Sequence, residues 1–141
     1  MTITRRASLV LVALLALTLT GVAQGQRTRH RGPIFAGLKS ATTCIPGPMT
    51  MGETTSYYLQ WEAATDRGTP SSKIVYNVYQ ATKAGGEDFS NPTYTTAPGV
   101  TSFDTPQLPS DKTFYFVVRA RDQAGNEDSN TVERQGQNLC V

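Results

Sequence analysis

Oxygen-bearing side chains are concentrated in one short stretch, DQAGNED, which runs from residue 122 to residue 128. Such oxygens are the ligands that calcium prefers, and a calcium ion takes about six to eight of them. Asp and Asn side chains also hydrogen-bond to their own backbone in tight turns, and Gly125 can adopt the positive φ angle that such a turn needs. The spacing matches no known calcium loop. We therefore interpret the stretch as a hairpin turn, with calcium binding as the alternative.

Residues for catalysis do not form a recognisable set. The single histidine, His30, precedes the first strand-like run, so it cannot complete a Ser-His-Asp triad, a Cys-His pair or a histidine metal site. The pair Gly85 and Gly86 indicates a turn rather than a phosphate-binding loop. The acidic residues fall on turns and strand exteriors, where nothing raises the pKa of one carboxyl as a glycosidase requires. We predict that the protein is not an enzyme and has no cofactor and no metal.

The segments that position these side chains are short alternating runs separated by Gly, Pro, Asn and Asp. The runs cover residues 33–41, 55–64, 73–81, 91–97, 101–108, 113–121 and 129–135. No helical period occurs after the apolar N-terminal segment. This spacing is typical of an all-β protein, and it predicts a seven-stranded immunoglobulin-like sandwich in one domain, residues 33–141.

Alternation also predicts which side chains face the core. Tyr57, Leu59 and Trp61 share one face of their strand, and Tyr58, Gln60 and Glu62 the other. The inward set continues with Ile74, Tyr76, Val78, Phe114, Phe116, Val118 and Ala120. The opposite face of the last of these runs carries two arginines, so we expect that face to be in contact with water.

Three sequence patterns together resemble the fibronectin type III domains of secreted bacterial proteins. The run 55–64 contains L-x-W, the run 73–81 contains Y-x-V, and RARDQAGNEDSN begins at residue 119. The resemblance covers most of residues 33–138, and it implies that loops 66–72 and 122–130 form a recognition edge. Phe114 is a departure, because the family usually has a tyrosine there whose hydroxyl ties down a corner.

Two surfaces are candidates for binding, and neither needs a cofactor. The loop residues would contact a protein partner: Asp66, Arg67, Asp122, Gln123, Asn126, Glu127 and Asp128. The outer sheet face would present Tyr79, Tyr115, Arg119 and Arg121, with the two tyrosines on neighbouring antiparallel strands. Tyrosine and arginine are common at protein-binding hot spots, and exposed tyrosines also stack on sugar rings. We predict a protein-binding or structural module, with a carbohydrate-binding module that uses Tyr79 and Tyr115 as the alternative.

Residues 1–25 have the features of a secretory signal peptide. Arg5 and Arg6 precede an apolar run over residues 9–23, which is shorter than the roughly 20 residues of a membrane-spanning helix. Small residues permit cleavage after Ala23 or Gly25. We expect a secreted or periplasmic protein with no membrane span in the mature chain.

A basic, flexible segment, QRTRHRG, follows the leader at residues 26–32. The rest of the chain is mildly acidic, whereas a nucleic-acid site needs a basic face on the folded domain. We therefore predict that nucleic acid is not a partner. The sequence leaves the oligomeric state open.

The cysteines of an exported chain are expected to form a disulfide, and this sequence has two, Cys44 and Cys140. The bond would join the first strand to the end of the last. In the chain-entropy model, a disulfide that closes the long loop from Cys44 to Cys140 stabilises the fold by about 4–5 kcal/mol. Most fibronectin type III domains lack such a bond, so it is a second departure from the family.

Overall fold

The computed structural model describes residues 32–45 and 52–139, and nearly all of their regular structure is β-strand. The elements are β1 (Leu38–Thr43), β2 (Thr54–Thr55), β3 (Tyr58–Trp61), the 3-10 helix η1 (Ser71–Lys73), β4 (Val75–Ala81), β5 (Tyr94–Thr95), β6 (Ser102–Asp104), β7 (Leu108–Pro109), β8 (Tyr115–Arg121), β9 (Glu133–Gln135) and β10 (Gln137–Asn138). The predicted all-β class is confirmed. The predicted leader, 1–25, and nearly all of the basic segment lie outside the described residues. No helix in the described part is long and apolar enough to cross a membrane.

The strands are shorter and more numerous than the seven predicted runs. The run over residues 101–108 forms both β6 and β7, which pair with different strands. Pro106 lies between them, and proline has no N–H to donate to a strand ladder. Between the two strands, Thr105 still bonds to the residue that precedes β3, because its backbone N–H donates to Tyr57 O at 3.0 Å.

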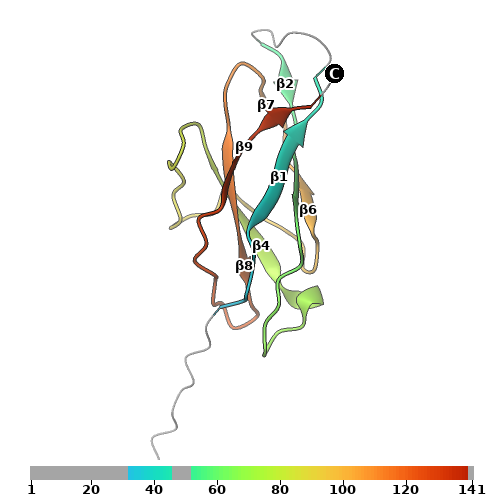
Figure 1. Ribbon diagram of the computed structural model, residues 1–141, viewed down its shortest axis with the longest axis vertical. Coiled ribbons are helices and arrows are strands. Elements are labelled where there is room, and N and C mark those ends of the chain that lie inside the picture. Colours follow the sequence, from blue (N-terminus) through green and yellow to red (C-terminus); the bar gives the residue numbers. More distant parts are fainter. Residues whose placement is uncertain (1–31, 46–51, 140–141) are drawn as a thin grey trace, which may run out of the picture.

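Two four-stranded sheets form the body of the molecule (Figure 1). The first has the order β10-β1-β3-β6, and the second has the order β5-β4-β8-β9. Strands β2 and β7 make a separate antiparallel pair at one end. Buried side chains from the two large sheets form one hydrophobic cluster, so the sheets pack against each other as a sandwich.

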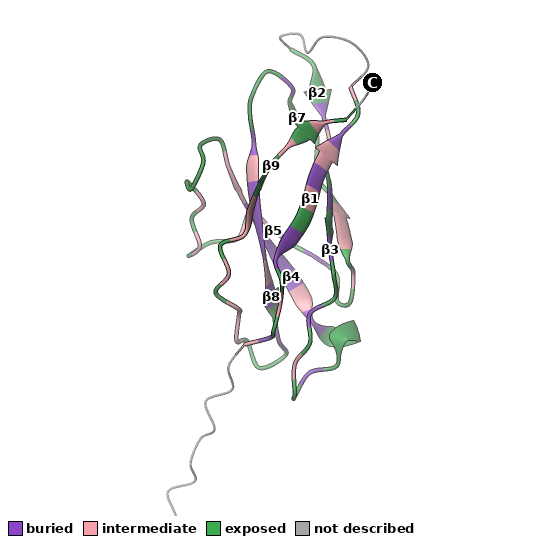
Figure 2. Ribbon diagram, in the orientation of Figure 1, coloured by how far each residue is buried: buried purple, intermediate pink, exposed green. Residues whose placement is uncertain are grey.

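The core contains the side chains that alternation predicts to face inward, and Figure 2 shows the buried positions following both sheets. Trp61 lies in this core, and its ring centroid is 5.1 Å from that of Tyr76. Both polar atoms have partners: Trp61 Nε1 donates to Val100 O at 3.2 Å, and Tyr76 Oη accepts from Ala64 N at 2.8 Å. These bonds remove the cost of burying the indole and phenol groups.

Strands β4 and β8 form the longest ladder of the sandwich, as predicted for the third and sixth runs. They pair antiparallel along their whole length, from Val75 opposite Arg121 to Ala81 opposite Tyr115. This register places Tyr79 opposite Val117, one step from Tyr115 on the same face. The ladder therefore fixes the outer face on which the aromatic and arginine candidates lie.

The two ends of the domain are joined at the edge of the first sheet. Strand β10 runs parallel to β1, with Thr43 opposite Asn138. The backbone N–H of Leu139 donates to Thr43 O at 3.0 Å, directly beside Cys44. Cys140 lies outside the described residues, so the predicted disulfide stays a prediction.

Candidate functional site

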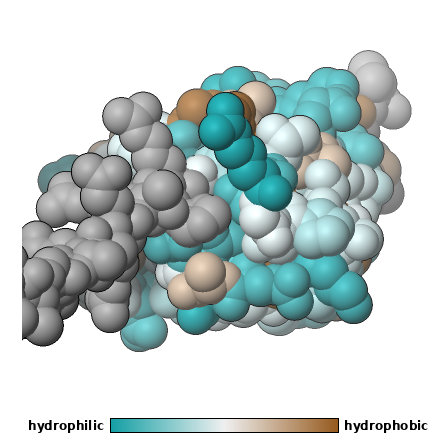
Figure 3. Space-filling view, turned by 90° about the horizontal axis from the view of Figure 1, so that it is seen from below, coloured by the Kyte–Doolittle hydropathy of each residue, from teal (hydrophilic) through white to brown (hydrophobic). Residues whose placement is uncertain are grey.

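The candidate loops 66–72 and 122–130 lie together at one end of the sandwich, which we call the loop end. The backbone N–H of Gln123 donates to Thr69 Oγ1 at 3.3 Å and joins the two loops. Asp66 Oδ2 accepts from Gly68 N and Thr69 N, both at 2.8 Å, and so shapes the first loop. Figure 3, which views the molecule from below the orientation of Figure 1, shows hydrophilic and near-neutral residues with a small hydrophobic patch on the visible part of this end.

Asp122 organises the second loop as a tight turn. Its carboxylate accepts from Asn126 N at 2.8 Å and from Asn126 Nδ2 at 2.7 Å, while its backbone O accepts from Gly125 N at 3.1 Å. Gly125 has the positive φ angle, 88°, that the turn requires. Burial raises the pKa of Asp122, but the hydrogen bonds from Asn126 and from the Ala124 and Gly125 backbone outweigh it and lower that pKa overall.

Asp128 binds the backbone of the adjoining strand. One carboxylate oxygen accepts from Ala120 N, and the other accepts from Asn130 N at 2.8 Å and from Asn130 Nδ2. The Asn130 side chain in turn donates to Val118 O at 3.0 Å. The carboxylates of this stretch are thus bonded to nearby N–H groups, which favours the hairpin-turn interpretation over a calcium site.

No group of three or more metal-ligating side chains occurs within residues 32–45 and 52–139. The single histidine of the sequence, His30, is outside these ranges.

Glu127 leaves the loop and reaches the outer face of the β4–β8 ladder. Its Oε1 accepts from Tyr79 Oη at 2.8 Å and lies 3.8 Å from an Arg119 guanidinium nitrogen. Its other oxygen accepts from the Asn77 side chain. Burial, followed by the hydrogen bond to Glu127, raises the pKa of Tyr79 to about 12.

A covering segment, residues 82–93, crosses the same face and places Phe89 on it. The Arg119 guanidinium carbon is 3.6 Å from the Phe89 ring centroid, and the Tyr79 and Phe89 centroids are 5.1 Å apart. Arg119 Nε also donates to Asn130 O at 2.9 Å. These contacts hold Arg119 flat against the sheet.

The prediction that Tyr79 and Arg119 form an exposed face was therefore wrong. Tyr79 is only 2% exposed, and the Arg119 side chain is only 13% exposed. Tyr115 is half-buried near the far end of the ladder. The physical reason is the covering segment, because its Phe89 ring packs against the Tyr79 ring and the Arg119 guanidinium group.

Three of the predicted site residues remain exposed at the loop end: Arg67, Arg121 and Gln123. The ion pairs of the described residues are Lys39–Glu62 and Arg119–Glu127, so neither exposed arginine has a carboxylate partner there. The predicted acids Asp66, Asp122, Glu127 and Asp128 are instead bonded within the fold. The carboxylates at this end are thus used in hydrogen bonds within the fold, and the Arg67 and Arg121 side chains are exposed beside them.

Two further features were not among the predicted site residues. Alternation correctly placed Tyr58 outward, and it is 40% exposed on the outer face of the first sheet, but it was not taken as a binding residue. On the second sheet, burial raises the pKa of Glu87, and the neighbouring Glu133 carboxylate raises it further. No local sequence pattern indicates that Glu87 and Glu133 lie close together, because Glu87 belongs to the covering segment and Glu133 belongs to β9.

Comparison of the chain with protein-family models, with curated proteins and with solved structures finds no match.

Proposed function

We propose that the chain is an exported, non-catalytic module of the fibronectin type III kind that binds a protein partner through the loop end. The strand order supports the family resemblance, because β1-β3-β6 opposes β5-β4-β8-β9 around a single core. In this fold the loops that follow β3 and β8 project from one end, where they are free to contact a partner.

The missing corner tyrosine is compatible with this proposal. Phe114 is buried, with its ring centroid 6.0 Å from that of Tyr57 and 6.4 Å from that of Phe116. Aromatic packing thus takes the place that the tyrosine has in the resembled family. Tyr115 lies on the opposite face of the strand and does not replace it.

The predicted disulfide is likewise part of the proposal. The hydrogen bond from Leu139 N to Thr43 O places the chain just before Cys140 beside the chain just before Cys44. Closing the edge there would stabilise an exported domain without occupying the loop end, which lies at the opposite end of the sandwich (Figure 1).

The observation that carries the binding proposal is that the acidic and basic side chains of the loop end have different roles. The acids hold the loop backbone in place, and Arg67 and Arg121 remain exposed without a carboxylate partner among the described residues. Arginine is enriched at protein interfaces, and its planar group forms paired hydrogen bonds with carboxylates. We therefore propose a partner that presents an acidic surface.

The same internal hydrogen bonds give the loop end a preformed shape. Loops 66–72 and 122–130 are fixed by Asp66 and Asp122 and are joined through Thr69. A surface that is ordered before binding loses less conformational entropy when a partner docks. The proposed protein binding therefore needs only an ordered loop surface, and it needs no reactive group.

The alternative carbohydrate site on Tyr79 and Tyr115 is not favoured. Stacking on sugar requires an open ring face, and the Tyr79 ring packs against Phe89. Opening that face would also break the Tyr79–Glu127 hydrogen bond.

The proposal is tested by capture from exported fractions of the source, with the full sequence expressed with its own leader. Three baits are compared: the wild type, R67E/R121E, and the charge-matched control K83E/K112E, whose lysines are exposed outside the loop end. We expect an acidic protein to be retained by the wild type and the control, and lost with R67E/R121E. Equal retention by all three baits, or no protein retained specifically by the wild type, would contradict the proposal.

A further inference from the structure

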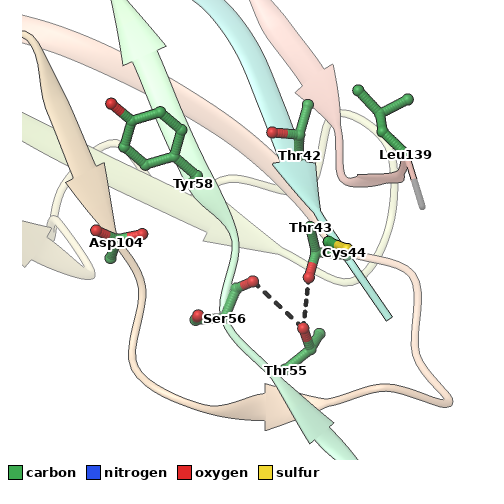
Figure 4. Close-up of a pocket in the computed structure, with 8 residues that line it drawn as sticks. All are labelled: Thr42, Thr43, Cys44, Thr55, Ser56, Tyr58, Asp104 and Leu139. Carbon is green, nitrogen blue, oxygen red and sulfur yellow. Dashed lines mark hydrogen bonds between the residues drawn. The ribbon is translucent and has the colours of Figure 1, made fainter. Parts of the chain in front are cut away.

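The outer face of the first sheet contains an aromatic side chain that the fold leaves open. Tyr58 is 40% exposed, lies opposite Thr42 of β1 and opposite Asp104 of β6, and accepts a hydrogen bond from Gln60 Nε2 at 3.4 Å. Figure 4 shows Tyr58 on β3, with Thr42 on one neighbouring strand and Asp104 on the other. In contrast to Tyr79, no ring of the described residues packs against it.

Tyr58 lines two open hollows in this surface. One has a volume of about 380 Å³ and is lined by Thr42, Thr43, Cys44, Thr55, Ser56, Tyr58, Asp104 and Leu139. The other has a volume of about 230 Å³ and is lined by Lys39, Tyr58, Gln60, Trp61, Glu62, Thr101 and Ser102. A ring shared by two hollows fits an extended ligand that continues past it on both sides. The chain from Ser56 to Glu62 spans about 20 Å at the rise of an extended strand.

The chemistry of the lining is largely uncharged and rich in hydrogen-bonding groups. Hydroxyl groups line both hollows, and Gln60 adds an amide. Lys39 and Glu62 pair with each other at 3.2 Å, so their charges compensate. Asp104 is then the remaining charge of the lining, and a carboxylate accepts hydrogen bonds from hydroxyl groups but repels anions.

We propose that this face, centred on Tyr58, binds an uncharged polysaccharide. A sugar ring has one apolar face that can stack on an aromatic ring, and its hydroxyl groups match the donors and acceptors on either side. The absence of an unpaired cation in the lining makes the surface complementary to a neutral chain rather than to an acidic one. The site lies on the sheet opposite to the one that carries Tyr79 and Tyr115, and it is independent of the loop end.

Binding is measured by isothermal titration of the full chain with four probes: cellohexaose, mannohexaose, chitohexaose and the acidic hexagalacturonate. We expect at least one neutral probe to bind and the acidic probe not to bind. Y58A should lower the affinity for the neutral probe by about tenfold or more. Y58F keeps the ring and should retain most of the affinity.

Two control variants test whether the sugar binds at Tyr58 and not elsewhere on the domain. Y115A alters a half-buried tyrosine of the other sheet and should leave the affinity unchanged, provided that its melting curve matches that of the wild type. R67E/R121E should also bind the neutral probe normally, so failure of the loop-end proposal would not affect this one. Failure of every neutral probe to bind, preference for hexagalacturonate, or equal affinity of Y58A and the wild type would overturn the inference.

Discussion

The hydrogen bond between Tyr79 and Glu127 provides the sharpest test of the buried outer face. The substitution Y79F removes only the hydroxyl that donates to Glu127 Oε1 at 2.8 Å. A hydrogen bond to a charged acceptor contributes about 1.5–3 kcal/mol to the free energy of unfolding. The guanidinium of Arg119 stays 3.8 Å from the same oxygen and compensates in part. We therefore expect a loss near the lower limit, about 1.5–2 kcal/mol at pH 7, which corresponds to a decrease in Tm of roughly 5–10 °C.

The pH dependence of this loss provides a second test. The pKa of Tyr79 is about 12 in the folded protein, compared with about 10 in an unfolded chain. A group whose pKa is raised by folding contributes stability that is present below its unfolded pKa and is lost as pH rises through its folded pKa. The difference in unfolding free energy between the wild type and Y79F should therefore narrow between about pH 10 and pH 12.

Chemical denaturation at pH 7 and at pH 11 measures both effects. Burial also raises the pKa of Tyr57, Tyr76 and Tyr94, so both proteins lose stability at high pH and only their difference reports on Tyr79. The matched control is Y58F, which removes a hydroxyl on the exposed face and should change stability by less than about 0.5 kcal/mol. If Y79F were as mild as Y58F at pH 7, the stabilisation assigned to the Tyr79–Glu127 hydrogen bond would be refuted.

Three other predictions concern packing, pH and redox state. G136A should destabilise the domain by about 1–3 kcal/mol in denaturant titrations, because a Cβ there would lie 2.4 Å from the Tyr57 ring; wild-type stability would show that the ring can move aside. E87Q should be more stable than the wild type at pH 7 but not at pH 4, since the raised pKa of Glu87 means that its contribution is lost as pH rises through that pKa; an equal difference at both pH values would contradict this. Reductant should lower the Tm of the wild type by many degrees but leave C44S unchanged, as expected for a disulfide that closes a long loop; an unchanged wild-type curve would exclude the bond.

Alternation and turn chemistry predict much of this fold from the sequence. The inward positions of Trp61, Tyr76 and Phe116 follow from period-two patterning, because one face of each strand must be buried. The turn over residues 122–126 follows from Asp122 and Gly125, whose side-chain and backbone preferences are local. Such features need no knowledge of distant parts of the chain.

The exposure of the outer faces could not be predicted in this way. Alternation shows that Tyr79 points away from the core, but whether a loop covers it depends on where Phe89 packs, which is a long-range contact. The same limit applies to charge. Glu127 and Asp128 are acidic in the sequence, yet their partners on β4 and β8 are set only by folding. Tyr58 was also predicted to point outward, and it is 40% exposed because no loop of the described residues covers it.

The central claim is that Arg67 and Arg121 recognise an acidic partner at the loop end. The most direct measurement is the association rate of the captured partner with the wild type, R67E/R121E and K83E/K112E at low and high salt. Exposed interfacial charges act mainly on association and on its salt dependence. We predict that R67E/R121E associates about tenfold more slowly than the other two at low salt, and that the difference decreases at high salt. Equal rates for the two charge-reversed variants would contradict the account.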